Sequence, residues 1–180
     1  MEIVKSIVRM FRGEVSTKKL IKRGLQVGSN FSRQGNCIID PPHCWLIKIG
    51  DDVTLANGVY ILAHDASTNK FMDYTKIGRV TIGDKVFVGA YSIIMPGVTI
   101  GNNVVIGCGS VVTKDVPDNV VVCGNPAKVL CTIEEYVEKC KNKMNEENTF
   151  SLDYTLRGKI DKSKKQEQVE ILKKGIGFTK

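Results

Sequence analysis

The sequence has no run of about 18 consecutive apolar residues, the minimum for a helix that spans a membrane. Residues 1–12, MEIVKSIVRMFR, have an apolar stripe but lack the continuous apolar core and cleavage site of a secretion signal. Only 5 of the 180 residues are proline and 17 are glycine, too few for collagen or for a disordered low-complexity chain. We therefore expect a cytoplasmic globular protein without stable membrane insertion.

Histidine and the common catalytic motifs are also scarce. The chain has 2 histidines, His43 and His64, and it contains no Gly-x-Ser-x-Gly elbow, P-loop or dinucleotide-binding Gly-x-Gly-x-x-Gly. The 6 cysteines form no Cys-x-x-Cys pair, and His43-Cys44 is the only tight Cys/His pair. The sequence therefore predicts free thiols in a reducing compartment and no metal site.

The net charge of +7 is concentrated at the ends of the chain. Residues 1–26 hold seven Lys/Arg and two Asp/Glu, residues 27–130 hold eight of each, and residues 131–180 hold eleven and nine. A nucleic-acid binder more often lines one groove or helix with basic residues and interleaves aromatic ones. We expect a solvated basic N-terminal helix and no nucleic-acid partner, while a weak attraction to anionic membrane surfaces or glycans stays open.

A six-residue repeat runs through the middle of the chain. Every sixth residue from Ile82 to Val112 is a β-branched aliphatic residue, and the residue after it is usually glycine. The fourth residue after each of these positions is valine or serine. A similar tract precedes it around Ile49 and Ile61. A period of six does not fit an α-helix, whose apolar stripe recurs every 3.6 residues. The repeated aliphatic positions are Ile82, Val88, Ile94, Ile100, Ile106 and Val112.

Strand geometry explains this period. Alternate side chains of a strand point to opposite faces, so a chain that turns a corner every six residues points one aliphatic side chain inward on each edge. Three edges close a triangular coil of about 18 residues, and coils stack about 4.8 Å apart. Glycine and the Asp/Asn residues that follow it suit the corners. The repeat therefore predicts a mainly β solenoid.

The repeat also marks the domain boundaries. Ile61 and Ile82 are 21 residues apart, which is not a multiple of six, so segment 65–79 must leave the coil as a loop. We expect an N-terminal helical segment (1–24), a β-helix of about five coils (25–130) and a C-terminal helical extension (131–180). Loops that interrupt a rigid repeat usually carry function.

The flanking segments read as short helices. Ser16 and Thr17 can cap a helix over KKLIKR, which ends before Gly24. Residues 133–144 carry apolar side chains at a spacing of three and four, which predicts an amphipathic helix. Residues 161–174, DKSKKQEQVEILKK, can form one more exposed helix.

His64 is the histidine better placed for chemistry. It lies where the repeat register breaks and the loop begins, and a neutral imidazole there can take a proton from a hydroxyl. A loop histidine that only satisfies backbone groups is the structural alternative. His43, which follows two prolines and precedes the single tryptophan, Trp45, is expected to have a packing or turn role.

The repeat residues closely resemble the hexapeptide-repeat acyltransferases. The likeness rests on residues 82–90, IGDKVFVGA, and on residues 93–129, IIMPGVTIGNNVVIGCGSVVTKDVPDNVVVCGNPAKV, and it extends over about 45–130. The best match is to the branch with galactoside, maltose and xenobiotic acetyltransferases and capsule or lipopolysaccharide O-acetyltransferases. The resemblance implies a left-handed parallel β-helix, a homotrimer with sites between neighbouring subunits, and acetyl-CoA as acyl donor.

The resemblance also implies roles for single residues. His64 matches the family's catalytic histidine, which would deprotonate an acceptor hydroxyl that attacks the thioester directly, so no cysteine nucleophile is needed. Ala90 and Cys108 match positions beside the pantetheine arm, although the family more often has alanine where Cys108 stands. Thr113 and Lys114 match residues near the nucleotide end of the cofactor. Lys128 matches a basic residue near its phosphates.

The acceptor is expected to be a sugar or a related small hydroxyl compound. Its pocket would be built from loop 65–79, the strand edge near Asn57 and Tyr60, and the neighbouring subunit, with Asp65 or Asp73 available to orient His64. A non-enzymatic β-helix scaffold or binding module and a serine acetyltransferase-like enzyme remain alternatives. A γ-type carbonic anhydrase would need three zinc-binding histidines, and this chain has two.

Overall fold

A computed structural model describes residues 14–180, which divide into two compact units. The first unit runs to Ile133 and the second covers Glu134–Lys180. The basic segment before residue 14, expected to be helical, lies outside the described residues. The expected helix over KKLIKR is present as α2 (Thr17–Lys22), and the backbone N–H of Lys19 donates to the Oγ of its N-cap residue Ser16.

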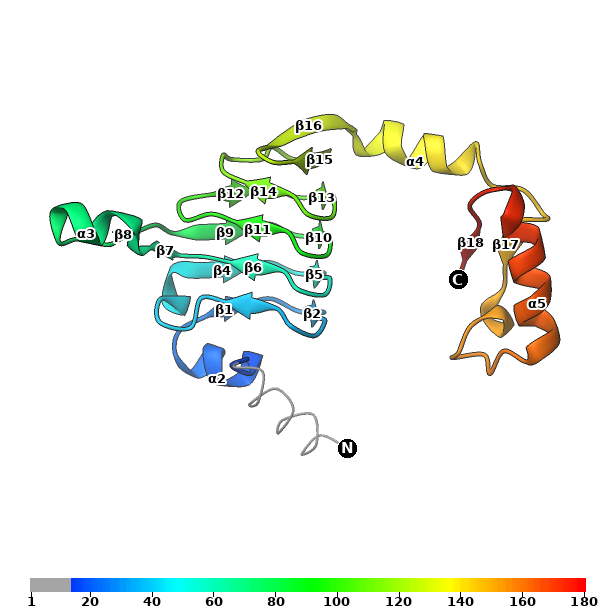
Figure 1. Cartoon of the computed structure of the whole chain (residues 1–180), viewed down its shortest axis with the longest axis horizontal. Coiled ribbons are helices and arrows are strands. Elements are labelled where there is room, and N and C mark those ends of the chain that lie inside the picture. Colours follow the sequence, from blue (N-terminus) through cyan, green and yellow to red (C-terminus); the bar gives the residue numbers. More distant parts are fainter. Residues whose placement is uncertain (1–13) are drawn as a thin grey trace. The chain divides into compact units, whose positions relative to one another are not determined.

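The first unit is a parallel β-helix (Figure 1). The chain contributes one strand to each of three sheets in turn, and each round of three strands is one coil. Residues 14–180 complete four coils and begin a fifth, which holds β15 and the bridge between Ile100 and Val116. The first sheet holds β1 (Gln26–Val27), β4 (Ile47–Ile49), β9 (Val80–Ile82) and β12 (Thr99–Ile100). The second holds β2 (Ser32–Arg33), β5 (Thr54–Leu55), β10 (Phe87–Val88), β13 (Val105–Ile106) and β15 (Val120–Gly124), with β16 (Ala127–Thr132) antiparallel at its edge. The third holds β3 (Ile38–Ile39), β6 (Tyr60–Ile61), β11 (Ile93–Ile94) and β14 (Val111–Val112).

The strand register confirms the predicted triangular coil. Phe87 pairs with Val105 and Ile93 pairs with Val111, partners that are one coil apart in the sequence. The side chains of the repeated aliphatic positions are buried, with Ile82, Val88 and Ile94 at most 1% exposed. Dispersion and apolar burial along this single axis therefore hold the coils together.

Three corners join the sheets, and we number them by the strands they connect. The first corner joins the first sheet to the second, the second corner joins the second sheet to the third, and the third corner leads from the third sheet to the next coil. Residues at equivalent corner positions in successive coils lie directly above one another, because the strands on either side are in register. The first and second corners are thus columns of stacked turns, whereas the third corner differs from coil to coil.

The first corner carries a ladder of acidic and amide side chains. The backbone N–H of Asp51 donates to Asp84 Oδ1 at 2.8 Å, that of Asp84 donates to Asn102 Oδ1 at 2.8 Å, and that of Asn102 donates to Asp118 Oδ1 at 2.7 Å. Each side chain satisfies an N–H of the neighbouring coil, which a strand end would otherwise leave unpaired. The glycine before each of the three N–H donors leaves room for the ladder: a Cβ on Gly83 would lie 2.6 Å from Asn102 Oδ1.

Each first corner also needs one residue with positive φ. Asparagine and aspartate, which tolerate this conformation, supply it in four coils: Asn30 (53°), Asp52 (55°), Asn103 (54°) and Asn119 (61°). In the third coil the same place is taken by Lys85, whose φ is 55°. Lys85 is therefore a strained position in an otherwise consistent column.

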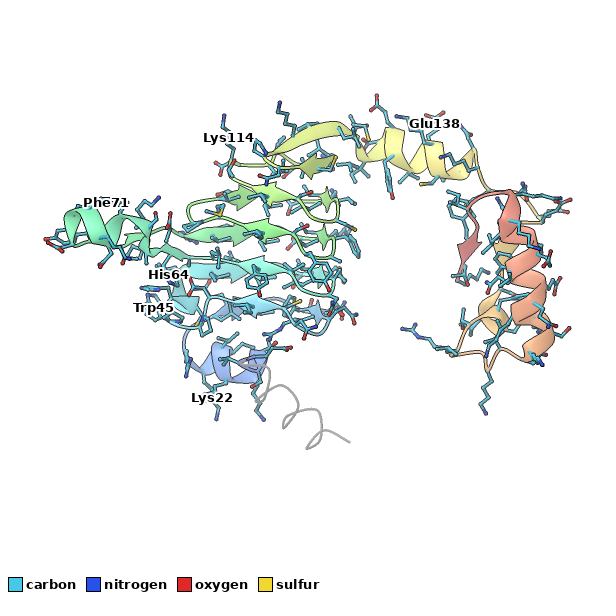
Figure 2. All side chains as sticks on the ribbon, in the orientation of Figure 1. Lys22, Trp45, His64, Phe71, Lys114 and Glu138 are labelled. Carbon is cyan, nitrogen blue, oxygen red and sulfur yellow. The ribbon has the colours of Figure 1, made fainter. Side chains whose placement is uncertain are left out.

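The segment expected to leave the coil is a hairpin that projects from the third corner (Figure 1). Its arms are β7 (His64–Asp65) and β8 (Lys76–Ile77), which are antiparallel, and its tip holds η2 (Ala66–Thr68) and α3 (Asn69–Met72). Phe71, labelled at the tip in Figure 2, is 90% exposed. The hairpin therefore extends beyond the face of the coils.

The remaining elements are short. A 3-10 turn, η1 (Cys44–Leu46), lies in the third corner of the first coil, and α4 (Ile133–Lys141) follows β16. The second unit pairs β17 (Thr149–Phe150) with β18 (Phe178–Thr179) and contains η3 (Leu152–Tyr154), the predicted exposed helix as α5 (Lys162–Ile171), and η4 (Leu172–Lys174). No helix among residues 14–180 is both long and apolar enough to cross a bilayer.

Candidate active site

His64 lies at the third corner of the second coil, at the base of the projecting hairpin (Figure 2). It is the first residue of β7 and pairs with Ile77 of β8. The core residue Ile61, 0% exposed, fixes the chain just before it, while the imidazole itself is 33% exposed. The ring is therefore held from behind by the rigid coil and remains reachable from outside.

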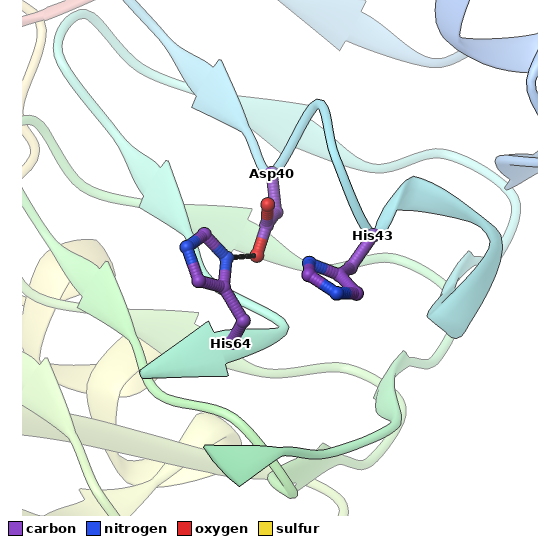
Figure 3. Close-up of side chains that lie close together, drawn as sticks. All are labelled: Asp40, His43 and His64. Carbon is purple, nitrogen blue, oxygen red and sulfur yellow. Dashed lines mark hydrogen bonds and ion pairs between the residues drawn. The ribbon is translucent and has the colours of Figure 1, made fainter. Parts of the chain in front are cut away.

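Asp40 lies at the same corner one coil earlier and contacts His64 (Figure 3). It follows β3, whose Ile39 is paired with Ile61 of β6, so strand pairing fixes the separation of the two residues. Asp40 Oδ2 is 2.6 Å from His64 Nδ1 and accepts a hydrogen bond of 2.7 Å from the backbone N–H of Ala63. Its side chain is 0% exposed.

This contact sets the tautomer of the imidazole. A carboxylate accepts hydrogen bonds, so Asp40 favours a proton on His64 Nδ1 and leaves a lone pair on Nε2. When Nε2 then takes a proton, the buried negative charge of Asp40 stabilises the resulting imidazolium. The pair has the geometry of a histidine base with its orienting carboxylate.

Asp65 and Asp73 were the two carboxylates expected from the sequence to orient His64. Asp65 is engaged across the hairpin, and Asp73 lies further along the loop. Asp65 Oδ2 forms an ion pair of 2.5 Å with Lys76 Nζ across the hairpin, and Oδ1 accepts from the backbone N–H of Ser67. The hydrogen bond from Lys76 holds the pKa of Asp65 well below its usual range. Asp73 ends α3 with a φ of 58°. Both residues therefore shape the hairpin.

His43 and Trp45 lie beside this pair. His43 immediately precedes η1, and its ring centroid is 5.4 Å from that of Trp45 and 4.9 Å from that of His64. Trp45 is 54% exposed. The expected packing role of His43 thus includes a direct contact with the His64 ring.

The positions matched to the acyl donor lie on different corners. Ala90 and Cys108 lie at the second corner one coil apart, where the backbone N–H of Gly109 donates to the carbonyl of Ala90 at 2.8 Å. Thr113 and Lys114 follow β14, so they lie at the third corner with His64 but two coils further along.

Lys128 is exposed on β16, opposite Cys123. Asn57 lies at the second corner, bonded to Tyr91 Oη at 3.3 Å, and Tyr60 is in β6. A single chain therefore does not bring Ala90, Cys108 or Asn57 to His64.

Sequence reasoning missed Asp40. Its equivalents in the next three coils are Leu62, Met95 and Thr113, so Asp40 is the one charged residue at that corner position. A carboxylate in a column of uncharged side chains, one coil before the histidine, was the available signal.

Family models match the chain in two places. The bacterial transferase hexapeptide model, described as six repeats, matches residues 79–114, and the hexapeptide repeat of succinyl-transferase matches residues 35–63. Both ranges lie within the β-helix, and the second ends one residue before His64. Both models describe hexapeptide-repeat transferases, and a β-helix with a histidine at an interrupted corner fits that class.

Similar proteins narrow this class. Protein CapG of Staphylococcus aureus is 42% identical over 157 residues, which cover 83% of this chain and 89% of that protein. A maltose O-acetyltransferase from Clostridium difficile 630 has a TM-score of 0.59 and 32% identity, over 73% of this chain and 84% of that one. A hexapeptide-repeat acetyltransferase from Vibrio cholerae, solved with acetyl coenzyme A, has a TM-score of 0.55 and 27% identity, over 61% of each chain.

The chain belongs to the hexapeptide-repeat acetyltransferases. Its β-helix is the left-handed one of that family, as the resemblance implied. It is an acyltransferase, and the acetyl coenzyme A complex of its Vibrio cholerae neighbour is consistent with acetyl-CoA as acyl donor.

Proposed function

We propose that this acetyltransferase transfers the acetyl group of acetyl-CoA to a hydroxyl of a sugar or related small acceptor, with His64 as general base. The observation that carries the proposal is the contact of 2.6 Å between His64 Nδ1 and the buried carboxylate of Asp40. That contact leaves Nε2 as the proton acceptor on a ring that is 33% exposed. A sugar acceptor is supported by the similarity to a maltose O-acetyltransferase.

The transfer needs one proton to move twice. His64 Nε2 takes the proton of the acceptor hydroxyl while the hydroxyl oxygen attacks the carbonyl carbon of the thioester. The new C–O bond forms, the C–S bond breaks, and the imidazolium returns the proton to the sulfur of coenzyme A. Asp40 accepts the hydrogen bond of the imidazolium and stabilises it between the two transfers. The product is an acetyl ester, and the base is regenerated.

The second corner suits the pantetheine arm. Cys108 and Gly109 are exposed there, and a Cβ on Gly109 would meet no atom within 4 Å, so the backbone is open to a ligand that carries amide groups. Ala90 completes this column of small residues. Lys114 and Lys128 are exposed cations that can pair with the cofactor's phosphates.

We further propose that the active unit is a homotrimer with sites between subunits. His64, Thr113 and Lys114 lie at the third corner, whereas Ala90 and Cys108 lie at the second. Two corners of one triangular coil face different directions, so a donor held at the second corner of one chain meets the imidazole of another chain. In a closed ring of three, each second corner faces the third corner of its neighbour.

Acetyl transfer tests the role of His64. Release of free thiol from acetyl-CoA is measured across a panel of sugars, with L-serine included to detect a serine acetyltransferase-like activity. His64→Ala should lower kcat by about 10²–10⁴-fold, the usual contribution of a general base. Asp65→Asn, a change at the adjacent residue, is the matched control. Unchanged turnover in His64→Ala would remove this residue from the mechanism.

Mixing two inactive variants tests the shared site. His64→Ala removes the base at the third corner, and Ala90→Trp blocks the proposed pantetheine path at the second. Trimers assembled at random from equal amounts of the two chains should place an intact pair of corners at about a quarter of the interfaces, so about a quarter of wild-type activity should return. No recovery, or a clean monomer by light scattering, would contradict the shared site.

A further inference from the structure

The same corner of the β-helix brings together three side chains of the kinds that can bind metal ions. One ligand atom from each of Asp40, His43 and His64 lies within 4.8 Å of the other two. Among residues 14–180, no other three histidine, cysteine or carboxylate side chains lie this close together. Figure 3 shows the carboxylate of Asp40 between the two imidazole rings.

Two atoms of this cluster lack hydrogen-bond partners. Asp40 uses Oδ2 for both the Ala63 N–H and His64 Nδ1, while its other oxygen, Oδ1, is buried and unpaired. His43 Nδ1 is also buried and unpaired. A buried polar atom without a partner costs about 1–3 kcal/mol, so the acid–base pair alone does not account for the arrangement.

We propose that Asp40, His43 and His64 form a site for a divalent transition-metal ion, typified by Zn²⁺, and that its occupancy inhibits acetyl transfer. Imidazole nitrogen with one carboxylate is a ligand set typical of Zn²⁺ and Co²⁺, whereas Mg²⁺ and Ca²⁺ prefer oxygen ligands throughout. Three protein ligands leave a fourth tetrahedral position for water. The buried negative charge of Asp40 attracts the positive ion.

The geometry requires only small movements. Tetrahedral zinc holds its nitrogen and oxygen ligands about 2.0–2.1 Å away, which places them roughly 3.3 Å from one another. The Asp40–His64 contact must open from 2.6 Å, while the three ligand atoms already lie within 4.8 Å of one another. His43 lies in the turn before η1 and His64 at the base of the hairpin, so neither ligand belongs to a core strand of the coils.

The inhibition rests on the proposed function, whereas the binding does not. An ion at this site occupies a His64 nitrogen and separates the ring from Asp40, so the base loses both its lone pair and its orienting partner.

The two histidines of the chain both belong to the cluster, which gives a direct probe of binding. Protein without a histidine tag is labelled selectively with ¹³C,¹⁵N-histidine, and Zn²⁺ is added to one equivalent. Both imidazole signals should move together, reach saturation near one ion per chain, and return with EDTA. A spectrum in which neither signal moves, or only one does, overturns the proposal.

The 6 cysteines are the competing ligands, and cobalt distinguishes them. Co²⁺ bound at the cluster should give visible d–d bands without a sulfur-to-metal charge-transfer band in the near ultraviolet. Calorimetric binding of Zn²⁺ with unmoved histidine signals would assign the ion to thiols such as the exposed Cys108 and would overturn the proposal.

One variant separates binding from catalysis. His43→Gln removes a ligand but leaves the Asp40–His64 contact, so acetyl transfer should stay within about threefold of wild type while zinc affinity falls at least about tenfold. Zinc should then no longer inhibit at the concentration that silences wild type. Asp65→Asn should keep both binding and inhibition. Equal inhibition of His43→Gln and wild type would refute the site, and a wild type that transfers no acetyl group would refute the proposed function while leaving the spectroscopic result to stand.

Discussion

Asp40→Asn tests the acid–base pair most directly. The change keeps the size of the side chain and removes its charge. An amide that presents its oxygen to Ala63 and His64 keeps both hydrogen bonds but cannot neutralise an imidazolium. An amide that presents its NH2 group instead donates to Nδ1, which moves the imidazole proton to Nε2 and abolishes the base.

The magnitude follows from the distance. Unit charges 2.6 Å apart attract by about 6 kcal/mol at an effective dielectric constant of about 20, before solvent screening at the one-third-exposed ring reduces this. A fall in kcat of about 10²–10⁴-fold corresponds to roughly 3–5.5 kcal/mol and lies within that limit.

The assay separates catalysis from binding and folding. Turnover is measured in EDTA at saturating acetyl-CoA, together with the KM for acetyl-CoA and the thermal unfolding midpoint. We expect kcat to fall while the KM for acetyl-CoA and the midpoint stay close to wild type. Asp65→Asn removes a carboxylate that pairs with Lys76, and this change should lower kcat little. Turnover within about threefold of wild type in Asp40→Asn would refute the reasoning, because a general base must depend on its orienting charge.

Three further predictions concern the scaffold and the hairpin. Lys85→Asn should stabilise the fold by about 1 kcal/mol in chemical denaturation, because asparagine tolerates the positive φ and matches the other first corners; an unchanged or lower stability would contradict the strain. Ile100→Asp should abolish the β-sheet circular dichroism, because it buries an unpaired charge at a position 1% exposed. Lys76→Met should raise the pKa of the Asp65 carboxyl toward the usual value of about 4, followed by carboxyl ¹³C NMR, so that its negative charge is lost at a higher pH as the solution is acidified; a pKa that stays low would assign the effect to Ser67.

The fold could be predicted because the repeat records it directly. Every sixth residue from Ile82 to Val112 is buried, and so are the small residues four places later, including Ser92 and Ser110. In a short-period solenoid each inward position is a local property of the sequence, so a single sequence was enough to predict the fold. The break between Ile61 and Ile82 located the hairpin for the same reason.

The site was harder to predict from the sequence than the fold, because its residues come from different coils. His64 stands at the register break and could be singled out, but Asp40 reaches it only through the pairing of β3 with β6. The contact of His43 with His64 likewise depends on the path of the turn after Asp40. The sequence predicted no metal site because it has no set of closely spaced Cys/His ligands beyond His43-Cys44, and the ligands of the site proposed above come from two successive coils.

The first-corner ladder leaves the number of coils undetermined. Asp51, Asp84 and Asn102 each accept the same bond from the preceding coil, so one more repeat unit could be inserted without altering any neighbour's hydrogen bonding. The limit is set at the end of the stack, where β16 reverses direction and pairs antiparallel with β15. That reversal occupies an exposed strand edge that would otherwise accept further strands from other molecules, so the strand that ends the solenoid also protects it from fibre-like growth.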